Sequence, residues 1–241
     1  MRQKISVCIA TYNGEKYIKE QLLSILPQLG TDDEVIISDD NSQDKTLDII
    51  KDFKDHRINI FINEGRKGYT PNFENALKHA NGDIIFLSDQ DDIWVPNKVQ
   101  SCLCHLRNAD FIVSDATLID SKGNYISESF YSLRKPFHSL VGNVLKFGYL
   151  GCCMAFNRRV LNKALPFPIR HNLCTHDNWL FLVAKTYYNV IITDEKLIQY
   201  RRHNNNTSTG GVQNTTNIRF KIFYRIYLIY QLFLLINKKV H

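Results

Sequence analysis

Several features that would place this chain in other protein classes are absent from its sequence. The six cysteines include no C-x-x-C pair, so the usual spacing of a zinc site is missing, and reduced thiols in a cytosolic protein are the simplest interpretation. No apolar segment with a cleavage site follows Met1, and the chain is therefore expected to stay in the cytoplasm. The apolar stretch 226–236 is shorter than the ~20 residues that a spanning helix needs.

The composition is that of an ordinary globular protein with a mild excess of basic residues. The 241 residues are 44% hydrophobic and 22% charged, which is enough for one large domain or two small ones. The formal net charge of +6 would suit nucleic acid, anionic lipid or a phosphorylated substrate. Outside the tail the basic residues are scattered among acidic ones, so we expect no nucleic-acid partner.

Short apolar runs alternate with helical patterns over the first half of the chain. Strands are predicted at 5–10, 34–38, 58–62 and 83–87, with helices between them. This alternation is typical of right-handed βαβ units and a mainly parallel sheet, in which ligands bind beyond the carboxyl ends of the strands. After residue 110 the pattern is less regular, with strands predicted at 111–113, 116–119 and 151–156 and a helix at 177–188.

Three carboxylates follow directly on the apolar run 84–87. Asp89, Asp91 and Asp92 would repel one another at the end of a buried strand and shed their hydration reluctantly, so such a cluster usually meets a cation. Hard divalent ions prefer carboxylate oxygens, and Mg²⁺ often shares its coordination with substrate phosphates. The run therefore predicts a metal and diphosphate site. The alternative is a solvated acidic turn that caps the next helix.

The tail is apolar and aromatic, and its ends are basic. Arg219, Lys221 and Arg225 open it, and Lys238 and Lys239 close it. Tyrosines at the level of the lipid headgroups and basic residues on anionic lipid are typical of an interfacial helix. The alternative is a core helix that packs on the domain. We favour the interfacial helix, because apolar residues surround nearly the whole segment.

The motifs, taken in order and with their spacing, resemble those of the family 2 glycosyltransferases. The segments are Ser6-Val7-Cys8-Ile9-Ala10-Thr11-Tyr12-Asn13, the acidic loop 34–46, Asn63-x-Gly65 with Asn75-Ala76-Leu77, and Asp89-Gln90-Asp91-Asp92-Ile93-Trp94. The Asp-Gln-Asp-Asp sequence of this motif, with Gly151-Cys152 and Tyr200-Arg201-Arg202-His203, is most similar to bacterial rhamnosyltransferase-type members. The resemblance covers about 5–211, most of the chain.

This resemblance implies an α/β protein with the GT-A fold, a Rossmann-like, mainly parallel central sheet flanked by helices. Residues 1–217 would form the glycosyltransferase domain, with a nucleotide-sugar-binding half at 1–110 and a less regular acceptor-binding half at 111–217. Residues 218–241 would form an amphipathic, basic and aromatic helix that associates with a membrane.

The resemblance also implies a UDP- or dTDP-sugar donor. Thr11 and Tyr12 would wall the base, and Asp39 would accept the N3–H of uracil or thymine, which cytosine lacks. The residues expected to bind the nucleotide sugar are Thr11, Tyr12, Asn13, Asp39, Asp40, Asp89 and Arg202. Asp40 would orient its loop, and Asp89 would reach the ribose or a metal-bound water.

Asp91 is the expected direct ligand of Mg²⁺ or Mn²⁺, with His203 as a second ligand. The cation would stabilise the charge that develops on the diphosphate as it leaves. Arg201 and Arg202 would help to neutralise that diphosphate. The alternative for these basic residues is a solvated loop.

Asp177 aligns with the general base of the family and would take the proton of the acceptor hydroxyl. The alternative is a helix N-cap, a frequent role of Asp. His176 replaces the more common first acid of this pair and would tune or orient Asp177. Gly151, Cys152 and Trp179 are expected on the acceptor side, where Trp179 would stack on a sugar or else anchor the core.

The resulting prediction is an inverting glycosyltransferase that acts by metal-assisted direct displacement. The acceptor would be a hydroxyl of a lipid-linked or cell-surface polysaccharide (O-antigen, capsule or exopolysaccharide), and the enzyme would lie on the inner face of the cell membrane. The motif wording favours dTDP-L-rhamnose, while UDP-galactose, UDP-glucose and UDP-N-acetylglucosamine stay open. The alternatives are a sugar nucleotidyltransferase, which would want a glycine-rich loop at 11–15, and a non-catalytic sugar-nucleotide-binding subunit.

Overall fold

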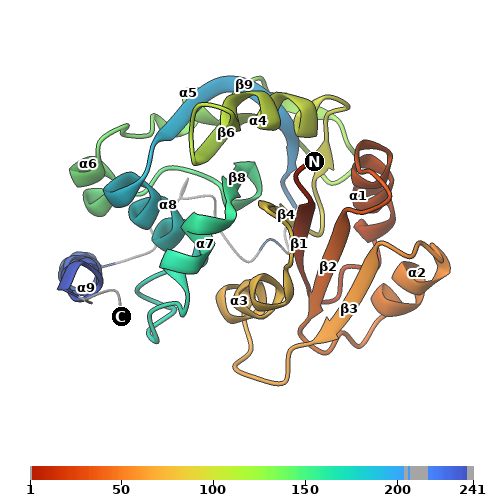
Figure 1. Cartoon of the computed structure of the whole chain (residues 1–241), viewed down its shortest axis with the longest axis horizontal. Helices are drawn as coiled ribbons and strands as arrows, with labels where there is room; N and C mark the ends of the chain where they lie inside the picture. Colours follow the sequence, from red (N-terminus) through yellow and green to blue (C-terminus); the bar gives the residue numbers. More distant parts are fainter. Residues whose placement is uncertain (1, 204–205, 207–216, 238–241) are drawn as a thin grey trace.

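The computed structural model describes residues 2–203, 206 and 217–237. Over these residues the chain builds one curled mixed sheet with strand order β3-β2-β1-β4-β8-β6-β9-β5, and β7 pairs with β6 (Figure 1). Lys238, Lys239 and most of the polar loop 204–211 lie outside the described residues.

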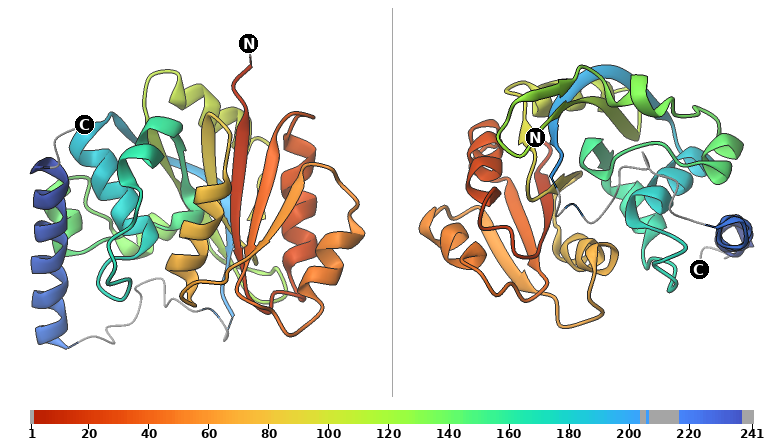
Figure 2. Two further views of the ribbon diagram at one scale, coloured as in Figure 1. Left: turned by 60° about the horizontal axis from the view of Figure 1, so that its bottom comes forward. Right: turned by 180° about the vertical axis from the view of Figure 1, so that it is seen from behind.

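The first half of the chain forms the parallel part of this sheet, as the sequence predicts. Its elements are β1 (Ile5–Thr11), α1 (Ile18–Ile25), η1 (Leu26–Gln28), β2 (Glu34–Asp39), α2 (Thr46–Asp52), β3 (Ile58–Ile62), α3 (Tyr69–His79) and β4 (Ile84–Asp89). β1 pairs in parallel with both β2 and β4, and helices cover the sheet (Figures 1 and 2). The central strands are buried on both faces, which explains why they read as continuous apolar runs.

The second half adds strands of both directions. Its elements are β5 (Ile93–Trp94), α4 (Lys98–Leu106), β6 (Phe111–Ile119), β7 (Tyr125–Ser127), α5 (Phe130–Arg134), α6 (Leu140–Leu145), η2 (Gly151–Cys153), β8 (Met154–Asn157), α7 (Arg158–Ala164), α8 (His176–Tyr187), β9 (Val190–Arg201) and α9 (Ile218–Asn237). β8 joins the halves, because it lies antiparallel to both β4 and β6.

Two of the predicted boundaries in this half are wrong. The two short strands predicted at 111–113 and 116–119 are one strand, β6. The polar residues between them, Ser114 and Asp115, do not end the strand, because the Asp115 carboxylate is hydrogen-bonded within the protein. The buried Asp115 carboxylate accepts hydrogen bonds from the Ser129 hydroxyl and the Tyr131 amide, and the ladder with β9 shifts register there instead of ending. The strand predicted at 151–156 begins with a 3₁₀ turn, and only its last part belongs to β8.

The register of the parallel strands brings the polar breaks of the sequence together. Thr11 lies opposite Asp39 in the pairing of β1 with β2, and Ala10 lies opposite Asp89 in the pairing of β1 with β4. The carboxyl ends of all three strands therefore meet at one edge of the sheet.

Helix α9 lies along one side of the domain, beside α6 and α8 (Figures 1 and 2). It runs for 20 residues, longer than the apolar stretch 226–236, and among the described residues it is the one helix long and apolar enough to cross a membrane. Leu228 and Leu232 are buried against the domain, while apolar side chains such as Phe223 and Phe233 are exposed. Both faces are thus apolar, and the expected amphipathic separation of polar from apolar residues is not observed.

Gly82, just before β4, packs closely against the backbone of β1. The Ser6 hydroxyl donates to Glu34 at 2.6 Å and accepts from the Gly82 amide at 2.6 Å. A Cβ on Gly82 would lie 2.6 Å from the Ser6 nitrogen and 2.8 Å from the Ile5 carbonyl carbon. Because backbone cannot move aside as a flexible side chain does, only glycine fits here.

We therefore expect Gly82→Ala to lower the free energy of unfolding by about 1–3 kcal/mol, the usual cost of overpacking. Urea denaturation followed by circular dichroism measures the change. Gly65→Ala is the matched control, because its Cβ would meet only the Asn63 side chain, at 3.3 Å. Equal stability of the two variants would contradict this interpretation of the packing at Gly82.

Candidate active site

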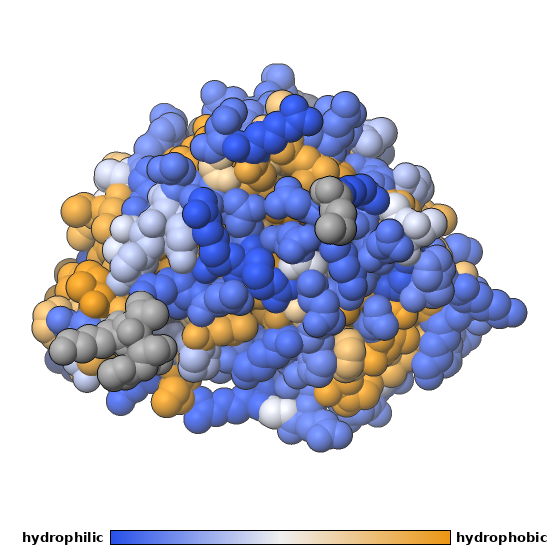
Figure 3. Space-filling view, in the orientation of Figure 1, coloured by the Kyte–Doolittle hydropathy of each residue, from blue (hydrophilic) through white to orange (hydrophobic). Residues whose placement is uncertain are grey.

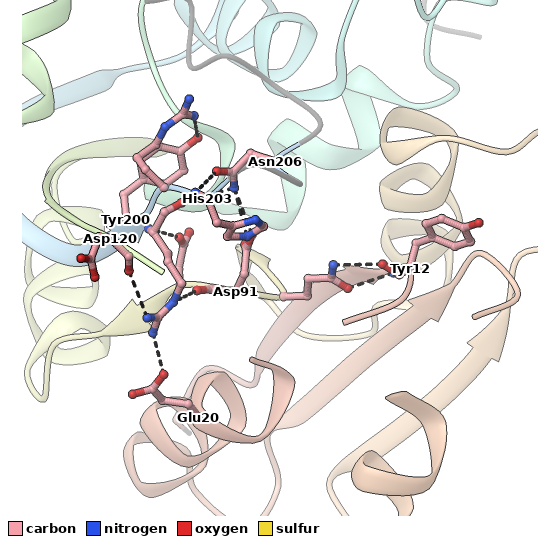
Figure 4. Close-up of polar contacts among 11 residues, drawn as sticks. Tyr12, Glu20, Asp91, Asp120, Tyr200, His203 and Asn206 are labelled. Atoms are coloured by element: carbon pink, nitrogen blue, oxygen red, sulfur yellow. Dashed lines mark hydrogen bonds and ion pairs between the residues drawn. The ribbon is translucent and has the colours of Figure 1, made fainter. Parts of the chain in front are cut away.

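The acidic run at the end of β4 is tied to the loop that follows β1. The Gln90 side chain accepts a hydrogen bond from the Tyr12 amide at 2.9 Å and donates one to the Tyr12 carbonyl at 3.1 Å (Figure 4). The Gln90 side-chain amide thus makes the same pair of hydrogen bonds to the Tyr12 backbone that a paired strand would make. The two loops at this edge of the sheet are held as one unit.

The structure brings together the two residues that the sequence predicts as metal ligands. Nε2 of His203 lies 2.7 Å from Oδ2 of Asp91, although 112 positions separate them in the chain. The His203 ring stacks on Tyr17 with ring centroids 4.9 Å apart, which fixes its orientation. Asn206 donates to the same Asp91 oxygen at 3.2 Å (Figure 4). Sequence reasoning missed Asn206, and its only signal there was a place in a polar run three residues after His203.

Arg201 does not have the predicted role at the diphosphate. Only 2% of the residue is exposed, and its guanidinium donates to Glu20 at 2.6 Å and to the Asp91 carbonyl at 2.8 Å. Its backbone amide donates to Asp92 at 2.9 Å. The charge of Arg201 is therefore used inside the protein, where it fixes the backbone of the acidic run.

Arg202 lies beside the end of β6. Its amide donates to the Ile119 carbonyl at 2.8 Å, and its guanidinium donates to the Tyr200 hydroxyl at 3.2 Å. Contact of Arg202 with a diphosphate stays a prediction.

The carboxylates of the acidic run crowd one another in a buried place. Ligand atoms of Asp89, Asp92 and Cys152 lie within 4.8 Å of one another. Burial raises the pKa of Asp89 to about 7, and the negative charges of Asp91 and Asp177 add to this effect. Burial likewise raises the pKa of Asp92, whose Oδ2 has no hydrogen-bond partner within the part of the chain that the structure describes. Such a carboxylate oxygen, in a cluster of carboxylates, fits a divalent cation.

A buried lysine supplies part of the compensating charge. Lys98 is 1% exposed, and its ammonium donates to the Cys152 carbonyl at 2.8 Å and lies 4.7 Å from the centre of the Trp94 ring. Its charge opposes the rise in the pKa of Asp89. Trp94 itself is buried, and its indole donates to Ser88, so it is a packing residue.

The predicted nucleotide loop is shaped by its own aspartates. Asp39 is fully buried and accepts hydrogen bonds from the Thr11 hydroxyl at 2.7 Å and from the hydroxyl and amide of Ser42 at 2.6 and 2.7 Å. Asp40 accepts from Asn63 at 2.6 Å and from the Gly68 amide at 2.7 Å. The Thr11 side chain therefore orients Asp39, and it is buried away from the position beside the base that was predicted for it.

Tyr12 and Asn13 lie on the outer part of this loop. Tyr12 is 56% exposed, so its ring is open to a planar base. Asn13 has φ of +48°, and its side-chain oxygen accepts from the Gln43 amide at 2.8 Å. Asn13 thus joins the loops that follow β1 and β2.

Asp177 lies in the first turn of α8, but it is not the N-cap. The residue at the N-cap position is Thr175, whose hydroxyl donates to Oδ1 of Asp177. The Asn178 amide donates to the same oxygen at 2.8 Å. The charge of Asp177 raises the pKa of Asp89 and, after burial, that of Tyr69, which reaches about 12. Asp177 and the acidic run thus belong to one electrostatic site.

The residues around Asp177 are packed closely. His176 is 5% exposed, its ring stacks on Phe73 at 4.1 Å, and burial lowers its pKa. A Cβ on Gly151 would lie 2.9 Å from His176 Nε2 and 3.2 Å from the Asp177 Cβ, so a larger residue here would displace the His176 ring. Trp179 is 3% exposed and its indole donates to the Ala164 carbonyl at 2.8 Å, so it anchors the core and is not placed to stack on an acceptor sugar.

The chain is similar to known proteins in its match to a family model, in its sequence and in its fold. The family model "Glycosyl transferase family 2" matches residues 6–165. The dTDP-rhamnosyl transferase RfbG of Shigella flexneri is 31% identical over 239 residues, which cover 90% of this chain and 77% of that protein. WfgD of Escherichia coli, named as a UDP-Glc:alpha-D-GlcNAc-diphosphoundecaprenol beta-1,3-glucosyltransferase, is 30% identical over 74% of this chain and 68% of its own length.

The fold is also shared with solved structures. TarS of S. aureus, in complex with UDP-GlcNAc, aligns over 99% of this chain and 68% of that chain with a TM-score of 0.72 and 18% identity. The match of the family model, the relatives along most of the chain and the shared architecture agree with the motif order. This chain belongs to the family 2 glycosyltransferases and has the GT-A fold.

Proposed function

We propose that this glycosyltransferase moves a sugar from a UDP- or dTDP-sugar to a hydroxyl of a lipid-linked or cell-surface glycan, with inversion at the anomeric carbon. The observation that carries the proposal is the proximity of the two acidic groups across Gly151-Cys152. Ligand atoms of Cys152, Asp89 and Asp92 lie within 4.8 Å of one another, and a Cβ on Gly151 would lie 3.2 Å from the Asp177 Cβ. A cation-binding carboxylate cluster and a separate carboxylate base are what direct displacement from a diphosphate requires.

On the donor side, Asp91 and His203 would hold Mg²⁺ or Mn²⁺, and Asp89 would face the nucleoside. When bound, the cation supplies charge that stabilises the leaving diphosphate. The protein's own contribution is orientation, because Tyr17 stacks on the His203 ring and Asn206 donates to the Asp91 carboxylate. Tyr12 would stack on the base, and the loop that Asp39 shapes through Thr11 and Ser42 would select uracil or thymine.

On the acceptor side, Asp177 would act as the general base. Thr175 and Asn178 hold its Oδ1, and Oδ2 would take the proton of the acceptor hydroxyl. As this proton moves, the acceptor oxygen forms a bond to the anomeric carbon, and the bond from that carbon to the diphosphate breaks. The diphosphate leaves with the electron pair. Because attack and departure occur on opposite faces, the anomeric configuration inverts.

The relatives suggest which donor and acceptor to test first. The name of RfbG supports dTDP-L-rhamnose, in agreement with the motif wording, and the name of WfgD supports UDP-glucose and a diphosphoundecaprenol-linked acceptor. Such an acceptor would place the enzyme on the cytoplasmic face of the membrane, with α9 as the element that binds the bilayer.

A donor screen tests the proposed function. We expect purified protein with Mn²⁺ to release dTDP or UDP from at least one of dTDP-L-rhamnose, UDP-glucose, UDP-galactose and UDP-N-acetylglucosamine. Chromatography of the nucleotide products measures the reaction, and GDP-mannose serves as the purine control. Turnover of GDP-mannose alone, or binding of no nucleotide sugar, would contradict the proposal.

Replacement of the candidate base should affect catalysis and leave donor binding intact. We expect Asp177→Asn to lower kcat for transfer by about 10²- to 10⁴-fold, the usual contribution of a general base. Isothermal titration with UDP or dTDP should give an unchanged Kd. Asp120→Asn is the control, since Asp120 lies in an exposed turn and bonds Asn124. A transfer rate near that of the wild type would exclude Asp177 as the base.

The role of His203 can be measured without turnover. We expect His203→Ala to weaken Mn²⁺ binding by at least about 10-fold, because an oriented ligand is lost. Electron paramagnetic resonance of free Mn²⁺ gives the affinity. His105→Ala is a close control, because the His105 ring also lies 2.6 Å from a carboxylate, that of Glu195. Equal Mn²⁺ affinities in the two variants would rule out His203 as a ligand.

A further inference from the structure

We propose that α6 and α9 together form one surface that docks on an anionic lipid bilayer. The inference rests on the proposed function, because an enzyme with a lipid-linked acceptor must work at a membrane. It extends the bilayer contact from the C-terminal helix to a segment almost 80 residues earlier in the chain, which sequence patterns do not single out.

Large apolar side chains are exposed on both helices. Val141 and Leu145 of α6 are 68% and 50% exposed, and Phe223 and Phe233 of α9 are 63% and 61% exposed. Figure 3 shows apolar side chains on the side of the molecule where α6 and α9 lie. A soluble domain seldom exposes several large apolar side chains on two contacting helices unless they meet a membrane or a partner.

The two helices are fixed against each other by polar contacts. The Arg225 guanidinium of α9 donates two hydrogen bonds, of 2.8 and 3.1 Å, to the carbonyl of Leu145 in α6. The Tyr227 hydroxyl accepts from the Arg170 amide at 3.1 Å, next to Ile169, which is 69% exposed. The exposed apolar residues of three segments therefore belong to one surface, which we call the α6–α9 face.

The charge of the segments that build this face favours an anionic partner. No Asp or Glu occurs between Glu128 and Asp177 or after Glu195. Lys135 at the end of α5 and Lys146 at the end of α6 are exposed, and Arg219 is exposed in the first turn of α9. Apolar residues with basic residues around them, and no acidic ones on the same segments, match a bilayer with negative headgroups better than they match a neutral or basic protein surface.

The face also has a fixed position relative to the candidate base. The Tyr224 hydroxyl of α9 accepts a hydrogen bond from the Asn178 side chain at 2.6 Å, and Asn178 follows Asp177 in α8. Leu228 and Leu232 of α9 are buried against the domain. A bilayer on the α6–α9 face would thus lie beside the helix that begins at His176, where an acceptor carried by a lipid has to arrive.

Vesicle binding tests the proposal. We expect the full chain to sediment with vesicles of 30% phosphatidylglycerol in phosphatidylcholine and to bind pure phosphatidylcholine at least tenfold more weakly. Val141→Asp with Leu145→Asp should reduce binding to the anionic vesicles at least tenfold, although α9 is unchanged. Ile126→Asp on β7 is the matched control, because Ile126 is 50% exposed, as is Leu145.

The other outcomes overturn the proposal. Anionic vesicles that bind the α6 double variant as well as the wild type would restrict any bilayer contact to α9. If the wild-type protein does not bind the anionic vesicles, a lipid bilayer is excluded as the partner of the α6–α9 face. A lipid-free dimer dissociated by the double variant, seen by light scattering, would identify a second copy as the occupant. Titration with UDP and dTDP separates these results from the proposed function, because all variants should bind nucleotide alike.

Discussion

The mutual repulsion of three carboxylates at the end of β4 is the constraint on which the site depends. Asp89, Asp91 and Asp92 lie together at the end of a central strand, and burial raises the pKa of Asp89 and of Asp92. Three basic residues from distant parts of the chain lie around these carboxylates and offset their repulsion. Lys98 approaches from α4, Arg201 fixes the backbone of the run from β9, and His203 contacts Asp91 directly.

The long strand β9 explains how the two halves of the domain cooperate. It runs beside β6 for its whole length, pairs with β5 just after the acidic run, and ends at Arg201, two residues before His203. The half of the sheet expected to bind the acceptor therefore also delivers a residue of the predicted donor site. Helix α8, at the same time, holds Asp177 on one side and contacts α9 through Asn178 on the other. The candidate metal ligands, the candidate base and α9 are thus linked by a few direct contacts.

The sequence was a good guide to residues at the strand ends and a poor one to the direction of side chains. Asp91 and His203 meet as predicted, although 112 positions separate them. Thr11 and Arg201 were predicted to face ligands, and Trp179 either to stack on a sugar or to anchor the core. All three are buried and hydrogen-bonded within the protein. In every case the residue type suits both roles, and only the packing around it decides which role is possible. Asn206 was missed because a polar run does not reveal which of its amides turns inward.

The sequence by itself determined the family, the parallel βαβ half and the positions of the polar breaks. These features are local, because apolar periodicity and turn residues act over a few positions. Only the tertiary structure decided that β6 is one strand, that Asp177 is not an N-cap, and that α6 lies against α9. These features depend on contacts between residues far apart in the chain. A buried carboxylate such as Asp115 is tolerated inside a strand only because Ser129 and Tyr131 reach it from another element.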